Sequence, residues 1–339
     1  MNILAFETSC DETAVAIVKD GREIIANEIL SQSDTHAIYG GVVPEIASRQ
    51  HIRAIGPLLQ RALGALPQGE TIDAVAVTSA PGLIGALLVG VNFAKSYAFA
   101  KGLPLIPVHH IRGHVASAYL SSPGLRPPFL ALVASGGHTQ ILHVKDYTDM
   151  EVAARSRDDA AGEAFDKAAR VLGLGYPGGP AIARHAEGGD DRKYPLPMAT
   201  VRGSEYDMSF SGLKTALQNL YHNAGQRGEA LDTRSLAASF ERAVCESLAP
   251  RLRAVSEALG VREVVLAGGV AANQKLRALL TNIFGGHAHI PPVYLCGDNA
   301  AMIAAQAFYE DRAGVRGGTA LNGNATVPAN ADWKSLCQQ

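Results

Sequence analysis

An internal repeat constrains the fold of this chain more than any other feature of the sequence. Residues 4–18 read LAFETSCDETAVAIV and residues 130–144 read LALVASGGHTQILHV, with five identities in fifteen positions at a constant offset of 126. Each copy is an apolar run, a short polar turn and a second apolar run, which is typical of a β-hairpin. The repeat predicts a duplicated domain, although chance similarity between two hairpins would also explain it.

Both halves continue in a comparable way. Residues 73–100 and residues 263–280 each read as a strand, a glycine turn and a helix, a unit that brings a helix N-terminus to the end of a sheet. Residues 293–310 read as a further strand, turn and helix, and the Pro-rich segment 121–128 marks a boundary. We predict an α/β fold with a central cleft: a first lobe over 1–125, closed by a C-terminal helix at about 298–325, and a second lobe over 126–297.

Composition narrows the class of protein. A length of 339 residues with 47% hydrophobic residues suits two globular domains, and four scattered cysteines are typical of a reduced cytosolic protein. The apolar stretch 83–100 contains Asn92 and Lys95, so it predicts a buried helix and no membrane association; the N-terminus lacks a signal-peptide pattern. The net charge of −2 means that any RNA partner needs a local basic patch or help from other subunits.

The segment HIRGH places His110 and His114 four residues apart ahead of a helix-like run. Side chains at this spacing share one face of a helix, so both imidazoles can reach one metal ion. Asp298, at the turn before the last helix, is a candidate third ligand, and two histidines with one carboxylate suit Fe(II) or Zn(II). The alternative is a chance pair, with one histidine structural and the other exposed, and a helix-capping aspartate.

Several glycine-rich or acidic turns are candidate binding elements. The turn at 134–139, ASGGHT, exposes backbone N–H groups to a phosphate or carboxylate, and the GGVAAN segment ending at Asn273 could hold a nucleotide. Asp166, on an expected helix before a Pro-Gly loop, could bind ribose hydroxyls. Asp11 and Glu12 are adjacent acids in the first hairpin turn and could act as a general base. Ordinary hairpin turns, caps and solvated acids remain the alternatives.

Taken in order, nine segments resemble the bacterial TsaD branch of the family once called glycoprotease or O-sialoglycoprotein endopeptidase. They are FETSCDET at 6–13, GGVVPEIASRQH at 40–51, TSAPGLIGALLVG at 78–90, HHIRGH at 109–114, ASGGHTQ at 134–140, GEAFDKAARVLGLGYPGGP at 162–180, SFSGLKTA at 209–216, AGGVAANQKLR at 267–277 and CGDNAAMIA at 296–304. They span almost the whole chain, and together they are very specific.

The resemblance implies a duplicated actin/hexokinase/heat-shock-type fold and a reaction. In that reaction a threonylcarbamoyl group passes from threonylcarbamoyl-adenylate to N6 of adenosine 37, in tRNAs that read codons beginning with A. The resemblance also implies partner proteins of the TsaB and TsaE kinds and one divalent metal ion, Fe(II) before Zn(II). The implied ligands are His110, His114 and Asp298. The implied substrate residues are Ala134, Ser135, Gly136, Gly137, His138, Asp166, Gly179 and Asn273. We take Asp11 as the candidate base, with Glu12 second, and the cytoplasm as the location.

Contacts to the tRNA anticodon stem–loop could come from basic residues in three places. They are the group Arg49, His51 and Arg53, then Arg112, and then the pair Arg155 and Arg157, although ordinary solvated cations explain each one as well.

Three other functions compete with the transferase. A metalloprotease would need an acid between the histidines, where the chain has Ile111. A small-molecule kinase of the same fold would hold Mg²⁺ with carboxylates and waters. A nucleotide-binding chaperone would have no use for the two histidines and Asp298.

Overall fold

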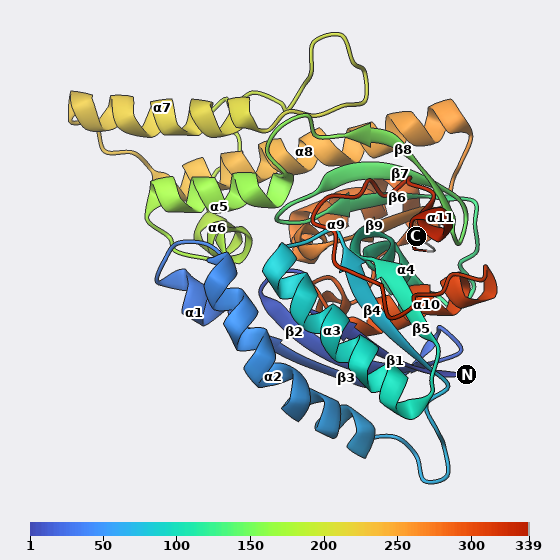
Figure 1. Ribbon diagram of the computed structural model, residues 1–339. Coiled ribbons are helices and arrows are strands. Elements are labelled where there is room, and N and C mark those ends of the chain that lie inside the picture. The colour runs from blue at the N-terminus through green and yellow to red at the C-terminus, as the bar shows by residue number, and fades with distance from the viewer. Residues whose placement is uncertain (338–339) are drawn as a thin grey trace.

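The computed structural model describes residues 1–337 and has two lobes, each built on a five-stranded mixed sheet (Figure 1). The first sheet consists of β1 (Asn2–Glu7), β2 (Glu12–Lys19), β3 (Glu23–Ser31), β4 (Ala74–Ala80) and β5 (Leu105–His109). The second consists of β6 (Phe129–Ala134), β7 (Thr139–Asp146), β8 (Asp149–Arg155), β9 (Val264–Ala267) and β10 (Ala288–His289). The order is β3-β2-β1-β4-β5 in one sheet and β8-β7-β6-β9-β10 in the other, which confirms the predicted duplication.

The two repeat segments form the first hairpin of each sheet, as predicted. β1 pairs antiparallel with β2 and β6 with β7, and β1 and β6 are buried along their whole length. These strands read as continuous apolar runs because helices cover both of their faces. β4 then joins β1, and β9 joins β6, in parallel. The turns after these four strands therefore lie at the carboxyl edges of the sheets, where ligands bind in open α/β sheets.

One face of the first sheet is covered by α2 (Pro44–Gly64) and α3 (Ile84–Lys101), which follow the short helix α1 (Ser33–Ala37). Leu58 of α2 and Val91 of α3 pack against Phe6 and Val77 in one buried cluster. The predicted buried helix at 83–100 is thus confirmed as α3. No helix within residues 1–337 is long and apolar enough to cross a membrane.

The last helix of each half lies across the other half. α4 (His110–Ser121) follows β5, yet its apolar residues Ile111 and Val115 pack with Phe129 and Val265 of the second sheet. α10 (Ala300–Arg312) follows the second sheet, and its residues from Ala300 to Phe308 pack on the first. The predicted return of the closing helix to the first lobe is confirmed, and the two helices pack against each other. The residue limits given to the lobes stay a prediction.

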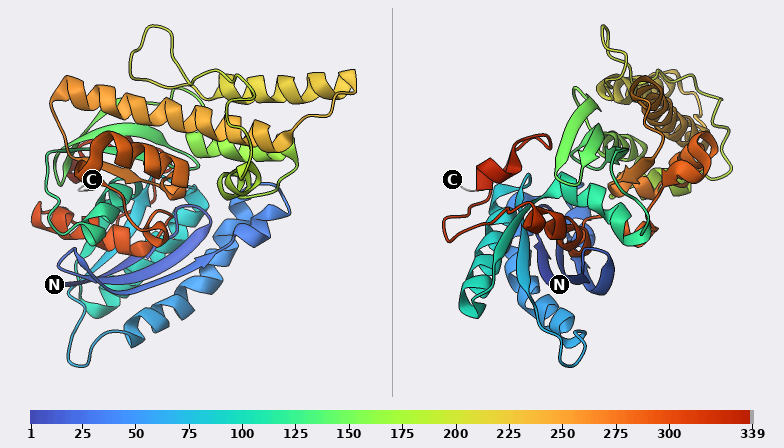
Figure 2. Two further views of the ribbon diagram at one scale, coloured as in Figure 1. Left: turned by 180° about the vertical axis from the view of Figure 1, so that it is seen from behind. Right: turned by 90° about the vertical axis from the view of Figure 1, so that its right-hand side faces the viewer.

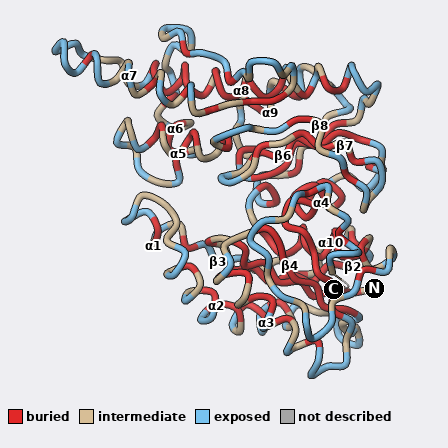
Figure 3. Tube along the Cα trace, turned by 45° about the horizontal axis from the view of Figure 1, so that its top comes forward, coloured by how far each residue is buried: buried red, intermediate tan, exposed pale blue. Residues whose placement is uncertain are grey.

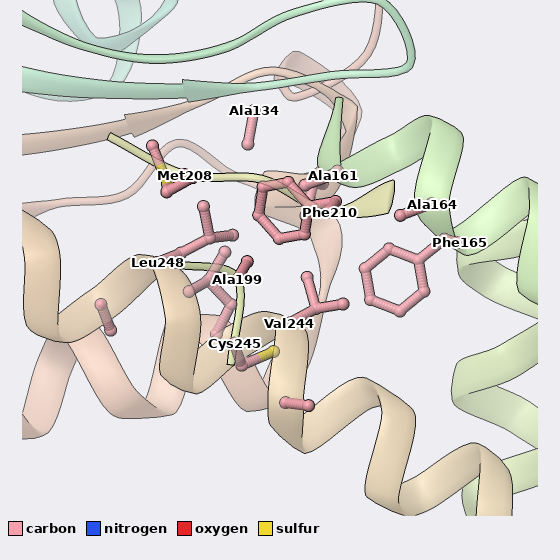
Figure 4. Packing of buried hydrophobic residues seen from close by; sticks show 14 of the residues in the cluster. Ala134, Ala161, Ala164, Phe165, Ala199, Met208, Phe210, Val244, Cys245 and Leu248 are labelled. Atoms are coloured by element: carbon pink, nitrogen blue, oxygen red, sulfur yellow. The ribbon is translucent and has the colours of Figure 1, made fainter. Parts of the chain in front are cut away.

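The second lobe adds a helical layer to its sheet. It consists of α5 (Ala161–Leu172), α6 (Gly178–Ala186), α7 (Ser211–Arg227), α8 (Thr233–Leu259) and α9 (Gln274–Phe284). Phe165, Phe210, Val244 and Leu248 belong to the core between α5, α8 and the sheet (Figure 4). Buried strands form the centre of each lobe, while the outer end of α7 is exposed (Figure 3). Figure 2 shows α7 and α8 on the side of the molecule away from the first sheet.

The structure corrects two details of the sequence interpretation. The strand expected at residue 293 is a 3₁₀ turn, η3 (Val293–Leu295), because Pro291 and Pro292 precede it and cannot donate to a ladder. Similar turns, η1 (Gly269–Ala272) and η2 (Gly285–His287), flank α9. The closing helix ends at Arg312 rather than near 325, and a short helix α11 (Trp333–Cys337) follows. Residues 187–203, between α6 and α7, include the buried Leu196 and Ala199.

Arg112 holds the C-terminal segment in place. Its buried guanidinium donates to the carbonyls of Thr148, Ala329 and Ala331 and lies 3.4 Å from the Glu310 carboxylate. The prediction that Arg112 binds RNA phosphate is therefore wrong, because its side chain is buried and engaged within the protein.

We expect Arg112→Met to lower the free energy of unfolding by about 3–5 kcal/mol, because Glu310 then stays buried without its cation. Urea unfolding measures the change. The control Arg253→Met breaks an exposed pair with Glu257 on α8 and should cost at most about 0.5 kcal/mol. Equal effects of the two substitutions would contradict the role of Arg112.

Candidate metal centre and substrate cleft

A cleft of about 1420 Å³ lies between the lobes at the carboxyl edges of both sheets. Its walls come from the turns after β1, β4, β6 and β9, from the first residue of α4, and from α5 and α6. The turns follow strands and several of them precede helices, where backbone N–H groups are unpaired and open to a ligand. The duplicated fold places both sets of turns around one cavity.

The three predicted metal ligands lie together at this cleft. His110 and His114 occupy successive turns of α4, and Asp298 lies two residues before α10. One donor atom from each residue falls within 4.8 Å of the others. Asp298 Oδ1 is 3.6 Å from His110 Nε2 and 3.2 Å from His114 Nε2. The sequence spacing predicted that the two histidines share one helix face. The packing of α4 on α10 brings the third candidate ligand, Asp298, next to them.

Glu7 at the end of β1 fixes the orientation of His110. Its fully buried carboxylate lies 3.0 Å from His110 Nδ1 and also accepts hydrogen bonds from the Ser9 backbone and the Thr78 hydroxyl. Burial alone would lower the pKa of His110, but Asp298 and Glu7 outweigh it and raise that pKa to about 9. The carboxylate on Nδ1 leaves Nε2 directed at Asp298, as in carboxylate–histidine–metal arrangements. The sequence interpretation missed Glu7, although it lies in the quoted FETSCDET segment.

His114 supplies an independent indication of a ligand. It is fully buried, and neither of its ring nitrogens has a hydrogen-bond partner, because its 3.2 Å approach to Asp298 lacks hydrogen-bond geometry. A buried imidazole with both nitrogens unpaired is costly and calls for an explanation. A metal ion accepting the Nε2 lone pair would explain it, and two imidazoles with one carboxylate suit a first-row divalent metal.

Most of the predicted substrate residues line the cleft. They are Ser135, Gly136, Gly137, His138, Asp166, Gly179 and Asn273. Ala134 is the exception, since it is fully buried at the end of β6. Its carbonyl would lie 2.4 Å from a Cβ on Gly268, so it supports the β9 turn from beneath the cavity.

Two groups of glycines lie in or next to the cleft. Gly162, Gly178 and Gly268 lie so close to other backbone that a Cβ would collide with it. A Cβ on Gly136, Gly137, Gly179 or Gly269 would meet nothing within 4 Å, and none of these four residues has a positive φ. Packing and backbone conformation therefore do not require glycine at these four positions. A ligand that approaches the bare backbone would require it.

Two polar substrate candidates are partly occupied within the protein. One oxygen of Asp166 accepts a hydrogen bond from the Gly178 backbone, and burial raises the pKa of its carboxyl. Asn273 caps α9 through its side-chain oxygen and donates its amide to Glu241. Asp166 keeps a second oxygen for a ligand, whereas Asn273 is suited to shaping the β9–α9 turn. Their contacts with substrate stay predictions.

The acids of the first hairpin turn, Asp11 and Glu12, also line the cleft. Burial, Asp298 and Asp11 together raise the pKa of Glu12 well above its usual range, although its carboxylate accepts a hydrogen bond from Ser31. Tyr176 shares this part of the cavity: burial and then Asp11 and Asp166 raise the pKa of its hydroxyl. The sequence interpretation named Asp11 and Glu12 but missed Tyr176, whose GYPGGP segment reads as a simple turn.

His51 does not belong to a basic surface patch. It is fully buried, with Nδ1 2.8 Å from the Thr13 hydroxyl and Nε2 2.9 Å from the Cys10 carbonyl. It links α2 to the hairpin turn that carries Asp11, so the prediction of an RNA contact there is wrong. Arg49 and Arg53 are exposed on α2, and Arg155 and Arg157 are exposed at the end of β8.

The sequence profile described as TsaD, tRNA N6-adenosine threonylcarbamoyltransferase, matches residues 23–305. The chain belongs to the TsaD family. The tRNA N6-adenosine threonylcarbamoyltransferase of Geobacillus kaustophilus is 50% identical over 331 residues, which cover 96% of each chain. The protein of the same name from Bacillus subtilis is 48% identical over 95% of this chain and 94% of its own.

Solved structures agree with the fold predicted for a TsaD family member. HypF in its phosphate- and nucleotide-bound form has a TM-score of 0.59 at 15% identity, over 96% of this chain and 47% of its own. Component A of the (R)-2-hydroxyglutaryl-CoA dehydratase of Acidaminococcus fermentans has a TM-score of 0.54 at 16% identity. The match covers 92% of this chain and 99% of that protein. These likenesses confirm the two-lobed actin/hexokinase-like fold, and they concern the fold alone.

We expect Zn(II), used as a probe, to displace about one proton on binding, because His110 with its pKa near 9 is protonated in the metal-free protein. The apparent affinity should therefore rise about tenfold per pH unit between about pH 7 and 8.5. Calorimetric titration in buffers of different ionisation enthalpy measures the proton release.

In the same titration, Glu7→Gln should weaken zinc binding about 10- to 100-fold, since it removes the group that orients His110. The control Glu257→Gln, on the exposed face of α8, should bind zinc as the unmodified chain does. Zinc binding that is independent of pH and of Glu7 would contradict this assignment.

Proposed function

We propose that this TsaD family member transfers the threonylcarbamoyl group from threonylcarbamoyl-adenylate to N6 of adenosine 37 in tRNAs that read codons beginning with A, releasing AMP. The observation that carries the proposal is the arrangement of the His110–His114–Asp298 triad and the open Ser135–Gly137 turn around one cleft. The names of relatives at 48–50% identity over nearly the full length support it.

His110, His114 and Asp298 would hold one divalent metal ion, for which we propose Fe(II), with Zn(II) as the alternative. The unpaired Nε2 of His114 and the Glu7-oriented ring of His110 support this donor set. When bound there, such an ion supplies Lewis-acid polarisation of a carbonyl oxygen. That oxygen would then lie near the lobe interface, where the triad meets the cleft.

The glycine turns would hold the AMP part of the adenylate. Gly136, Gly137 and Gly269 leave their backbone open to the cavity, and exposed N–H groups in such turns bind phosphate oxygens. The free oxygen of Asp166 would accept a hydrogen bond from a ribose hydroxyl near Gly179. The two lobes then enclose the reacting carbonyl and exclude water, which would otherwise hydrolyse the activated carbamate.

The adenine N6 amine is a weak nucleophile and must lose a proton as it attacks the carbonyl. Asp11 lies in the first hairpin turn at the cleft, and we propose that its carboxylate accepts this proton. Glu12 is the second candidate, since its raised pKa brings the carboxyl closer to neutral pH. The electron pair of the broken C–O bond leaves with the AMP phosphate.

We further propose TsaB-like and TsaE-like partner proteins and, because the substrate is tRNA, a cytoplasmic location. The competing functions have less support. No acid stands between the two histidines as a metalloprotease requires, and the imidazole-rich triad does not suit the oxygen-coordinated Mg²⁺ of a kinase.

The deciding experiment measures threonylcarbamoylation of a tRNA transcript by the purified chain, given threonylcarbamoyl-adenylate and its partners. His110→Ala should abolish the modification, because the donor set is lost. The control His222→Ala lies on the exposed face of α7 and should keep full activity. Modification by both variants would remove the metal from the chemistry. No modification by the unmodified chain, with active partners, would overturn the function.

The base assignment predicts a second result. Asp11→Asn should lower kcat by about 100-fold or more, because the attacking amine loses its proton acceptor, with a smaller change in KM for tRNA. Glu12→Gln should retain more activity than Asp11→Asn. Single-turnover rates with preformed adenylate give the comparison, and the opposite ranking would exchange the two roles.

A further inference from the structure

The rim of the cleft carries a loop that belongs to the first lobe. Residues 38–42 connect α1 to α2, and Gly40, Gly41 and Val42 line the cavity. Just before these glycines, Ile38 and Tyr39 are 83% and 59% exposed. An exposed aromatic ring beside a cavity offers a flat surface on which a nucleic-acid base can stack.

This loop has a defined shape. Gly40 has a φ of 71° and Gly41 a φ of 156°, values that side chains with a Cβ rarely adopt. His36 fixes the base of the loop. Its ring nitrogen Nδ1 accepts a hydrogen bond from the Val43 backbone N–H, and its backbone carbonyl accepts one from the Gly41 N–H. Tyr39 is therefore presented by an ordered turn and not by a free segment.

Arg170 of α5 reaches the loop from the second lobe and donates to the Gly40 carbonyl. Arg170 and Arg184 of α6 are both exposed and both line the cleft. No carboxylate in the described part of the chain forms an ion pair with either arginine. Their neighbours differ: Lys167 is paired with Asp159 and Glu163, and Lys275 is paired with Asp191.

This inference rests on the proposed function. We propose that a group of three residues, which we call the cleft rim, binds the unpaired anticodon loop of the tRNA. The cleft rim consists of Tyr39, Arg170 and Arg184. Tyr39 stacks on an unpaired base, and the two guanidinium groups bind phosphates of the same loop. Guanidinium groups without carboxylate partners keep donors free for phosphate oxygens, and Arg170 uses only one nitrogen on the Gly40 carbonyl. The cleft lining as a whole holds more carboxylates than lysines and arginines, Glu187 among them, so charge alone does not bind the loop and the aromatic surface carries part of the affinity.

The reaction itself requires an unstacked substrate. The adenine N6 atom must reach the triad inside the cleft, and enzymes that modify a base act on single strands or take the base out of its stack. A base next to the target then loses a stacking neighbour. Tyr39 can replace that neighbour at the cavity mouth, on the first-lobe side, while the arginines hold the backbone on the second.

Binding of a labelled anticodon stem–loop RNA to the metal-loaded chain, alone and with its partners, tests the stacking contact. Tyr39→Ala should weaken binding roughly 5- to 150-fold, the usual effect of losing one base–aromatic stack. Tyr39→Phe should bind normally, because it keeps the ring. Phe99→Ala removes a 78%-exposed ring at the end of α3 and serves as the matched control. An equal loss for Phe99→Ala, or none for Tyr39→Ala, overturns the proposal.

The salt dependence tests the phosphate contacts. Replacing both Arg170 and Arg184 with alanine should reduce the slope of log affinity against log salt by about 1.4, or about 0.7 per phosphate contact. Arg262→Ala, just before β9 at the edge of the sheet away from the cleft, should leave the slope unchanged. Tyr39→Ala should not change the affinity for a fully paired RNA hairpin, which has no unpaired base to stack. Weaker binding of that hairpin by the variant would overturn the stacking role.

Activity separates this inference from the proposed function. With saturating adenylate, Tyr39→Ala should raise KM for tRNA and leave the KM for adenylate unchanged. A raised KM for adenylate alone overturns the rim assignment while the transferase stands. If the unmodified chain binds the stem–loop through Tyr39 but never modifies it, the rim assignment stands and the transferase fails.

Discussion

The packing of α4 against α10 is the contact on which the site depends. Each helix starts in one half of the duplicated fold and lies on the sheet of the other, so both N-terminal ends meet at the cleft. Gly113, between the two histidines, permits this contact, because a Cβ there would lie 2.6 Å from the Ile303 side chain. His110 and His114 come from one half and Asp298 from the other. The candidate metal site therefore forms only when the lobes are assembled.

A buried cluster of charge follows from that geometry. Glu7 and His110 are buried, Asp298 is 18% exposed at the cleft, and the three lie within hydrogen-bond or ion-pair distance; burial of such groups is unfavourable unless they pair. The acids raise the pKa of His110, and His110 in turn lowers that of Asp298 against the opposing effect of burial. The ends of the lobes away from the cleft are joined by Arg22, whose guanidinium donates to carbonyls at the end of α4 and to the hydroxyls of Tyr147 and Tyr309. The lobes are thus held at one end and open at the other, where the cleft lies.

The local pattern of the sequence predicted the regular elements well. Apolar hairpins, a glycine turn after a parallel strand and the four-residue spacing of His110 and His114 depend on residues close in the chain, so the repeat, α3, α4 and the strand–turn–helix units were all predicted. The failures came where burial by distant residues decided the outcome. His51 and Arg112 read as surface cations. In the structure His51 is enclosed by Thr13 and the Cys10 carbonyl, and Arg112 is enclosed by the C-terminal segment. Residues 293–295 read as a strand, but no sheet edge receives them after two prolines.

The sequence by itself determined the duplication, the fold class, the family and most of the candidate site, because the motifs carry these in short segments of fixed spacing. Only the tertiary structure decided which residues support those motifs. Glu7 reaches His110 across more than a hundred residues, Ala134 turns out to lie beneath the cavity, and Arg170 meets the Gly40 loop from the opposite lobe. Side-chain partners separated this far along the chain are set by how sheets and helices pack, and no local pattern of residues encodes that packing.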